Sequence, residues 1–153
     1  MQQAEAFMEV KMNLQKDDFL NIRKWMYRNA RPLDIARWKY HFENGKVEDV
    51  LAVMEVYQNE DGGFGSAFEA DSWNPNSTPY TTSIAVRLLD ELGFCDKNHP
   101  IVCGILRYLE NTTDFIEGYW PAVVPSNNYF PHRGGLLIML KDWTNGGILL
   151  LHS

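Results

Sequence analysis

The stretch Gln58-Asn59-Glu60-Asp61-Gly62-Gly63-Phe64-Gly65 lies between two helical patterns and decides the fold of this chain. The preceding segment, 47–58, has apolar residues at i, i+3, i+4 and i+7 from Val47, which is the stripe of an amphipathic helix. The following segment, 79–92, opens at Thr78-Pro79, and proline suits the first turn of a helix. A helix that runs into Gln-x-x-x-Gly-x-Phe and then into a second helix is typical of a repeat unit.

The residues of this motif have structural roles that follow from their chemistry. Gln58 can hydrogen-bond the ends of neighbouring helices through both halves of its amide. Gly62 permits a positive φ where the chain reverses, and Phe64 fills the gap between helices. The Gly-x-aromatic pattern recurs as Gly118-x-Trp120, which indicates an internal repeat.

Most of the remaining chain also has helical patterns. A weak pattern covers 4–12, and a stronger one begins at Asp17-Asp18, whose carboxylates favour a helix N-terminus. Two further helices are predicted over 32–43 and 98–110, each with a proline in its first turn. No segment shows the sustained apolar and polar alternation that a sheet requires. We therefore predict an all-α fold of stacked antiparallel helical hairpins.

Residues 50–94, VLAVMEVYQNEDGGFGSAFEADSWNPNSTPYTTSIAVRLLDELGF, resemble one repeat of the α/α-toroid superfamily. This superfamily includes the terpenoid (squalene) cyclases and the β subunits of protein prenyltransferases. The upstream RNARPLDIARWKYHFENG resembles bacterial members of the same group, and the likeness spans about residues 18–131. The resemblance implies a domain over 1–131 that forms part of a toroid, with outer helices at 47–58 and 98–110. It also implies that the chain acts on an isoprenoid or similar apolar substrate.

The resemblance places the inner helices, 32–43 and 79–92, around a central cavity with catalytic groups at its mouth. Aromatic side chains there would cradle an isoprenoid chain or stabilise a carbocation by cation–π attraction. Asp71 is the candidate acid, because a carboxyl with a raised pKa can protonate a double bond, and His132 is a second candidate acid or base. The candidate substrate-binding residues are Arg31, Arg37, Trp38, Trp73, Asn74, Tyr80 and Thr81. The alternative for the loop members is that they only shape a turn.

The sequence departs from the resemblance in its chemistry. Neither the acid motifs of protonating cyclases nor the Asp-Asp-x-x-Asp magnesium cluster occurs, and the Asp-x-Cys of the prenyltransferase zinc site is also missing. Cys95, His99 and Cys103 lack an evident fourth ligand, so zinc is disfavoured, and Cys103 is expected to pack as a small apolar side chain. We expect no cofactor and no resident metal, with Mg²⁺ an option only alongside an isoprenoid diphosphate.

Two other functions stay open at this point. The first is a non-catalytic helical-repeat module that binds a ligand or a protein. Such a module needs no acid motif, so the absence of these motifs agrees with it. The second is a glycan-acting α/α barrel, in which Trp38, Trp73 and Trp120 stack on sugars and a carboxylate pair acts.

Charge and hydropathy exclude several classes of partner. The chain of 153 residues has a net charge of −6 and no basic patch, so we expect no nucleic-acid binding. No apolar run approaches the roughly 20 residues that span a bilayer. The N-terminus lacks the pattern of a signal peptide, so we expect a cytoplasmic protein.

The pattern of the sequence changes over the last segment, 132–153. After His132 it reads RGGLLIMLKDWTNGGILLLHS, in which short apolar runs alternate with Gly-Gly pairs. We expect this tail to be the frameshifted or truncated end of a longer toroid gene, the alternative being a natural C-terminus that packs over the open face. A partial toroid leaves an apolar face open. Self-association is then expected, and activity belongs to the full-length parent rather than to this chain.

Overall fold

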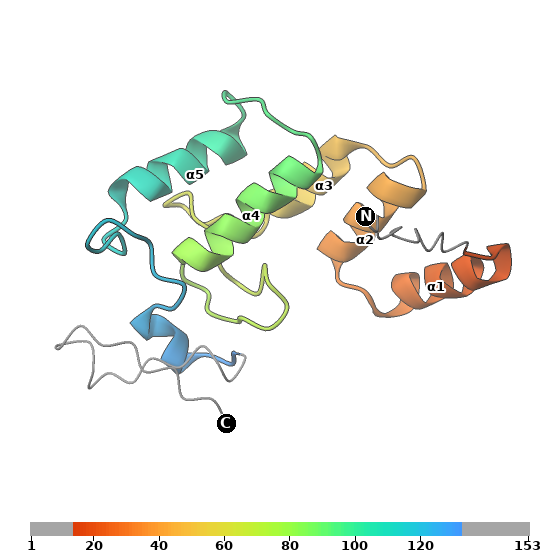
Figure 1. The fold of residues 1–153 in the computed structure, drawn as a ribbon, viewed down its shortest axis with the longest axis horizontal. Helices are drawn as coiled ribbons and strands as arrows, with labels where there is room; N and C mark the ends of the chain where they lie inside the picture. Colours follow the sequence, from red (N-terminus) through yellow and green to blue (C-terminus); the bar gives the residue numbers. More distant parts are fainter. Residues whose placement is uncertain (1–13, 133–153) are drawn as a thin grey trace, which may run out of the picture.

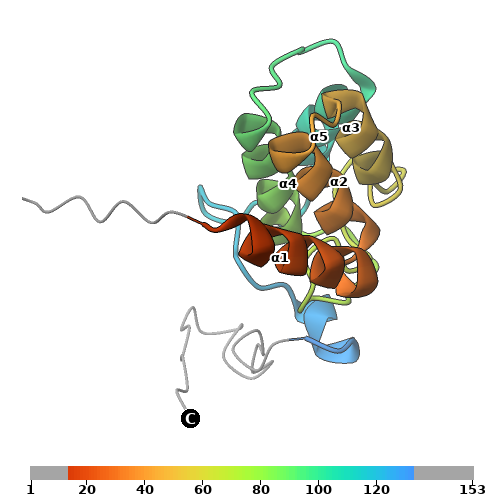
Figure 2. The ribbon, with the colours of Figure 1, turned by 90° about the vertical axis from the view of Figure 1, so that its right-hand side faces the viewer.

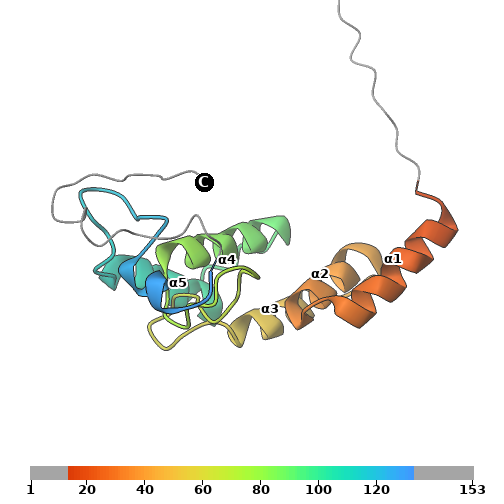
Figure 3. The same cartoon turned by 90° about the horizontal axis from the view of Figure 1, so that it is seen from below.

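The computed structural model describes residues 14–132, and within this range it is all-α, as predicted. The helices are α1 (Lys16–Asn29), α2 (Pro32–Phe42), α3 (Val47–Glu55), α4 (Pro79–Glu91), α5 (Pro100–Asn111) and the 3-10 helix η1 (Pro125–Tyr129). They follow one another along the long axis, from α1 and α2 at one end to α4 and α5 towards the other (Figure 1). Figure 3 shows the same succession from below. The pattern at 4–12 and the residues after His132 lie outside the described range.

The helix boundaries follow the local signals in the sequence closely. Thr78 caps α4 by accepting a hydrogen bond from the Thr81 backbone N–H at 3.0 Å, and prolines begin α2, α4 and α5. The helix predicted over 47–58 ends earlier, at Glu55, because the backbone N–H of Gln58 bonds only three residues back.

Cys103 does not pack as predicted: it is exposed on α5, with its thiol near the Lys97 carbonyl oxygen at 3.4 Å.

One apolar core joins α2, α3, α4, α5 and the long connection between α3 and α4. Its fully buried members include Val50, Met54, Phe64, Ala85 and Ile101, each 0% exposed. Helix α2 adds Leu33 and Ala36, so the core draws on all four helices and the connection, and burial of apolar surface holds this part together. Helix α1 contributes no buried residue to this core.

The Gln58 loop connects α3 to α5 as well as to α4. The Gln58 side-chain amide donates to the carbonyl oxygens of Gly62 at 2.9 Å and of Ile101 at 3.0 Å. Gly62 has φ +96°, and a Cβ there would lie 2.1 Å from the Gly104 carbonyl oxygen. A Cβ on Gly104 would in turn lie 2.4 Å from the Gln58 amide nitrogen. Gly62 is therefore required by the close approach of loop and helix, whereas a Cβ at Gly104 would shift the end of the Gln58 side chain and disturb its two hydrogen bonds.

Helix α1 is attached to α2 by aromatic and ionic contacts instead. Phe19 stacks on Trp38 with ring centroids 5.4 Å apart. The Glu43 carboxylate accepts hydrogen bonds from Arg23 at 2.7 Å, from the Tyr27 hydroxyl at 2.6 Å and from the Trp38 indole at 2.7 Å. These donors lower the pKa of Glu43 from 4.5 to about 2, the hydrogen bond from Arg23 being the largest cause. Figure 2 looks onto this end, with α1 nearest the viewer.

None of the helices in residues 14–132 has the length and apolar character that crossing a bilayer would demand.

Candidate functional site

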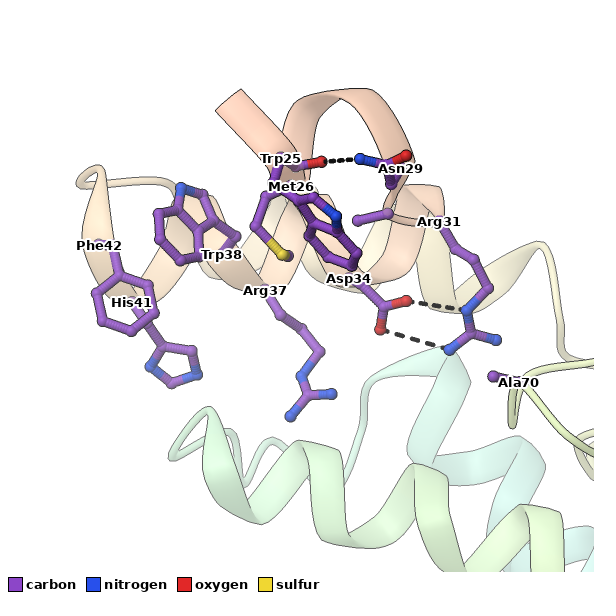
Figure 4. Close-up of a pocket in the computed structure, with 11 residues that line it drawn as sticks. Trp25, Met26, Asn29, Arg31, Asp34, Arg37, Trp38, His41, Phe42 and Ala70 are labelled. Carbon is purple, nitrogen blue, oxygen red and sulfur yellow. Dashed lines mark hydrogen bonds and ion pairs between the residues drawn. The ribbon is translucent and has the colours of Figure 1, made fainter. Parts of the chain in front are cut away.

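A cavity of about 530 Å³ lies between α1 and α2 and is open to solvent (Figure 4). We call it the α1–α2 groove. Its aromatic lining comes from Trp25 on α1 and from Trp38 and Phe42 on α2, and its polar lining comes mainly from α2. Three of the predicted binding residues, Arg31, Arg37 and Trp38, line this one cavity.

The three aromatic side chains of the groove differ in how much surface they offer. Trp25 is 61% exposed and Phe42 is 59% exposed, whereas Trp38 is only 9% exposed. The indole of Trp38 is held by Phe19 and Phe42 and by its hydrogen bond to Glu43. Trp38 therefore packs mainly as a structural residue, and Trp25 and Phe42 carry the apolar surface that a ligand would cover.

The polar wall of the groove is built by Arg37 and His41, which lie one turn apart on α2 and extend towards α4 (Figure 4). Arg37 binds both carboxylate oxygens of Glu91, at 2.6 and 3.2 Å, and His41 binds the same carboxylate at 2.7 Å. Burial alone would raise the pKa of Glu91, but the hydrogen bonds from Arg37 and His41 outweigh it and lower this pKa.

The other end of the groove is closed by Arg31. Its guanidinium pairs with Asp34 at 2.9 Å and donates to the carbonyl oxygens of Ala67 at 2.7 Å and Phe68 at 3.2 Å. These bonds fasten the connection between α3 and α4 to the start of α2. The guanidinium of Arg31 is therefore engaged in bonds within the protein, and the Asp34 carboxylate is paired with it.

A second cavity, of about 590 Å³, lies beside α4 and is lined by Tyr80, Arg87 and Trp120 among others. The Tyr80 hydroxyl donates to Glu69 Oε1 at 2.9 Å. This bond is the largest cause of a raised Tyr80 pKa, followed by burial. The other oxygen of Glu69, Oε2, is buried and has no hydrogen-bond partner among residues 14–132, which is uncommon for a native carboxyl group.

The predicted acid, Asp71, is exposed and lines neither cavity, although its negative charge helps to raise the Tyr80 pKa. The second predicted acid or base, His132, forms an isolated backbone bridge with Ser72 and binds the Phe130 carbonyl oxygen at 2.6 Å. The structure therefore does not bring the two predicted catalytic residues into either cavity.

The other predicted binding residues have mostly structural contacts. Asn74 is 3% exposed and donates to Ser126 and Asn127 at 2.8 Å, which ties η1 to the connection between α3 and α4. Thr81 is buried in the cap of α4. Trp73 is 60% exposed, and its indole donates to the nearby Ala70 carbonyl oxygen at 3.1 Å.

The three tryptophans of the glycan-acting hypothesis share no cavity. Trp38 lines the α1–α2 groove, Trp120 lines the second cavity, and Trp73 lines neither. Within residues 14–132, no three His, Cys, Asp or Glu side chains converge as a metal site would require.

Sequence reasoning missed Trp25, His41 and Glu91. His41 had a usable signal, since it lies one helical turn after Arg37 and so shares its face. Trp25 had one as a tryptophan within the helix predicted to begin at Asp17-Asp18. Glu91 had none, because it meets Arg37 only through the packing of α4 against α2.

No protein-family model, curated protein or solved structure matches the chain.

Proposed function

We propose that this protein is a helical-repeat protein of the α/α-toroid kind, similar to terpenoid cyclases and prenyltransferase β subunits, that binds an isoprenoid or similarly apolar molecule in the α1–α2 groove. The observation that carries the proposal is the pair of open aromatic side chains, Trp25 and Phe42, facing one cavity of about 530 Å³. Ligand sites are commonly about 300–1,000 Å³ and lined mostly by apolar side chains.

The expected driving force is burial of apolar surface. Covering a large apolar side chain contributes roughly 1.5–3 kcal/mol. Trp25 alone then contributes about a tenfold to hundredfold gain in affinity. Its indole ring also gives a flat surface suited to the branched, unsaturated chain of an isoprenoid.

Between catalysis and binding alone, the contacts favour binding. The groove has one carboxylate, Asp34, and it is paired with Arg31, while Asp71 lies outside the groove. A cyclase needs an acid aimed at its substrate. We therefore propose a non-catalytic binding role for residues 14–132, with a cyclase-like or prenyltransferase-like reaction as the second candidate.

Calorimetric titration of the full chain with farnesol tests this proposal. Trp25→Ala should weaken binding at least about tenfold. Trp73→Ala is a matched control, because Trp73 is equally exposed, at 60% against 61%, but lies outside the groove. Equal losses in the two variants, or no heat of binding in the unaltered chain at two temperatures about 20 °C apart, would rule out the α1–α2 groove as the ligand site.

A further inference from the structure

Charge is distributed unevenly between the two ends of this molecule. Residues 16–46, which include α1 and α2, have eight Lys and Arg against four Asp and Glu, a net charge of +4. Residues 47–132 have three Lys and Arg against thirteen Asp and Glu, a net charge of −10. Helices α1 and α5 lie at opposite ends of the long axis (Figures 1 and 3). The described part of the chain therefore has a basic end and an acidic body.

The outer face of α1 carries basic side chains that the rest of the described chain does not neutralise. Lys16, Leu20, Lys24 and Arg28 recur every four residues, so they lie on one side of the helix, and all four are exposed. Within residues 14–132, Lys24 and Arg28 have no ion pair or side-chain hydrogen bond. Helix α1 also adds no buried residue to the core. This surface, which we call the α1 face, is therefore open to a partner.

An acidic surface lies beside α5, where two adjacent residues of the helix contact two different loops. The Arg107 guanidinium donates to the Glu60 carbonyl oxygen at 2.9 Å. The Tyr108 hydroxyl donates to the Asp114 carboxylate at 3.4 Å. Phe115 in the second loop is 50% exposed and adds apolar surface. The two segments, which we call the acidic loops, gather four carboxylates beside one helix, those of Glu60, Asp61, Asp114 and Glu117.

We propose that copies of this chain associate head to tail, with the α1 face of one copy docked on the acidic loops of a second copy. The two surfaces have opposite charge, which steers association and fixes its orientation. They lie at opposite ends of one molecule, so a second copy is needed to bring them together (Figure 3). Self-association in general is expected from the sequence, and the inference adds the two surfaces and the direction of the contact.

Local pairing outweighs the repulsion between two copies of net charge −6. At about 0.1 M salt, exposed charges more than about 10 Å apart are largely screened, so the groups that meet at the contact decide its sign. Exposed ion pairs alone contribute little, about 0–1 kcal/mol each. Burial of Leu20, 39% exposed, and of Phe115 is therefore needed to add apolar stabilisation. The α1 face contains no residue that lines the α1–α2 groove, so this contact does not depend on the proposed function.

Sedimentation velocity of the full chain, from low to high micromolar concentration, tests the contact. Raising the salt from about 0.1 M to about 1 M should weaken association at least about tenfold, because the screening length falls to about 3 Å. Lys24→Glu and Glu117→Lys should each weaken it at least about tenfold, since each places like charges across the contact. An equimolar mixture of these two variants should associate within about threefold of the unaltered chain. In the mixture, one variant still supplies a basic α1 face and the other still supplies acidic loops.

Lys46→Glu and Asp90→Lys are the matched controls. They make the same changes in net charge at exposed positions outside the α1 face and the acidic loops, and should leave association within about twofold. Thermal melts check that every variant is folded. Loss in both test variants, with recovery in their mixture, supports the inference. A monomer at all concentrations in about 0.1 M salt would overturn it, and so would association that the test and control variants change equally or that the mixture fails to restore.

Discussion

The two Gly-x-aromatic loops of this protein, 58–64 and 114–120, share a sequence pattern but have opposite surroundings. Both contain a glycine with positive φ, +96° at Gly62 and +90° at Gly118. Phe64 is 0% exposed and lies in the core, whereas Trp120 is 45% exposed. A Cβ on Gly62 would strike α5, while a Cβ on Gly118 would meet nothing within 4 Å.

The difference shows that the Gly-x-aromatic pattern specifies a turn. How much the turn contributes to the stability of the fold depends on its tertiary contacts. The first loop is held by α5, because Arg107 also donates to the Glu60 carbonyl oxygen at 2.9 Å. The second loop closes on itself through paired backbone hydrogen bonds between Ile116 and Tyr119, at 2.9 and 3.0 Å. Mutations at matched positions should therefore have unequal costs, and this can be measured pair by pair.

The largest contrast is expected between Phe64→Ala and Trp120→Ala. The first leaves a cavity in the core and should lower the free energy of unfolding by about 3–5 kcal/mol. The second removes a half-exposed side chain and should cost less than about 1 kcal/mol. Urea denaturation of the two variants measures both values, and equal losses would show that the second loop is packed as tightly as the first.

The next largest contrast in unfolding free energy is expected between Gly62→Ala and Gly118→Ala. Alanine at positive φ costs about 1–2 kcal/mol at either position. Gly62→Ala carries an additional cost, because its Cβ would meet the backbone oxygen of Gly104, which cannot rotate away. We expect at least about 3 kcal/mol for Gly62→Ala. Chemical denaturation of Gly62→Ala beside Gly118→Ala isolates the cost of the contact with α5.

The side chains at the start of each loop should give a smaller difference. Gln58→Ala removes both hydrogen bonds to Gly62 and Ile101, and should cost about 1–3 kcal/mol. Asp114 stands at the position of Gln58 in the second loop, and within residues 14–132 the Asp114 carboxylate accepts one long hydrogen bond, at 3.4 Å, from the Tyr108 hydroxyl. Asp114→Ala should change the unfolding free energy by less than about 0.5 kcal/mol, as scanning calorimetry would show.

The same division between local and tertiary causes explains which features the sequence could predict. The start of α4 was predictable because Thr78 and Pro79 act on adjacent backbone groups. The all-α fold was predictable because apolar periodicity is also a local property. The early end of α3 was not, since it depends on how Gln58 turns to reach α5.

The candidate site was predictable only in part for the same reason. Arg37 could be selected as a basic residue on a helix that the resemblance implies to be an inner one, but its partner Glu91 lies 54 residues away and reaches it through packing. Asp71 could be selected as a carboxylate near an aromatic, but its exposure depends on the path of the loop. A glycine within α5, Gly104, was a signal of close packing that the sequence offered and that was not used.

A third region, the attachment of α1 to α2, extends the comparison because it depends on charge rather than on a glycine loop. The pKa of Glu43 is lowered from 4.5 to about 2, so its pairing adds stability above about pH 4.5. That contribution is lost as the pH falls through about 2, when the folded-state carboxylate takes up a proton. We expect Glu43→Gln to be less stable than the unaltered chain at neutral pH, and this difference to close between pH 4.5 and 2. The effect should be the smallest of the series, because Arg23 is 47% exposed and solvent weakens such a pair.

Urea denaturation across this pH range measures the difference, with Glu110→Gln as the control that should show no such convergence. A gap that persisted at pH 2 would mean that Glu43 acts through packing or neutral hydrogen bonds, and that α1 is held like the Gly62 loop after all.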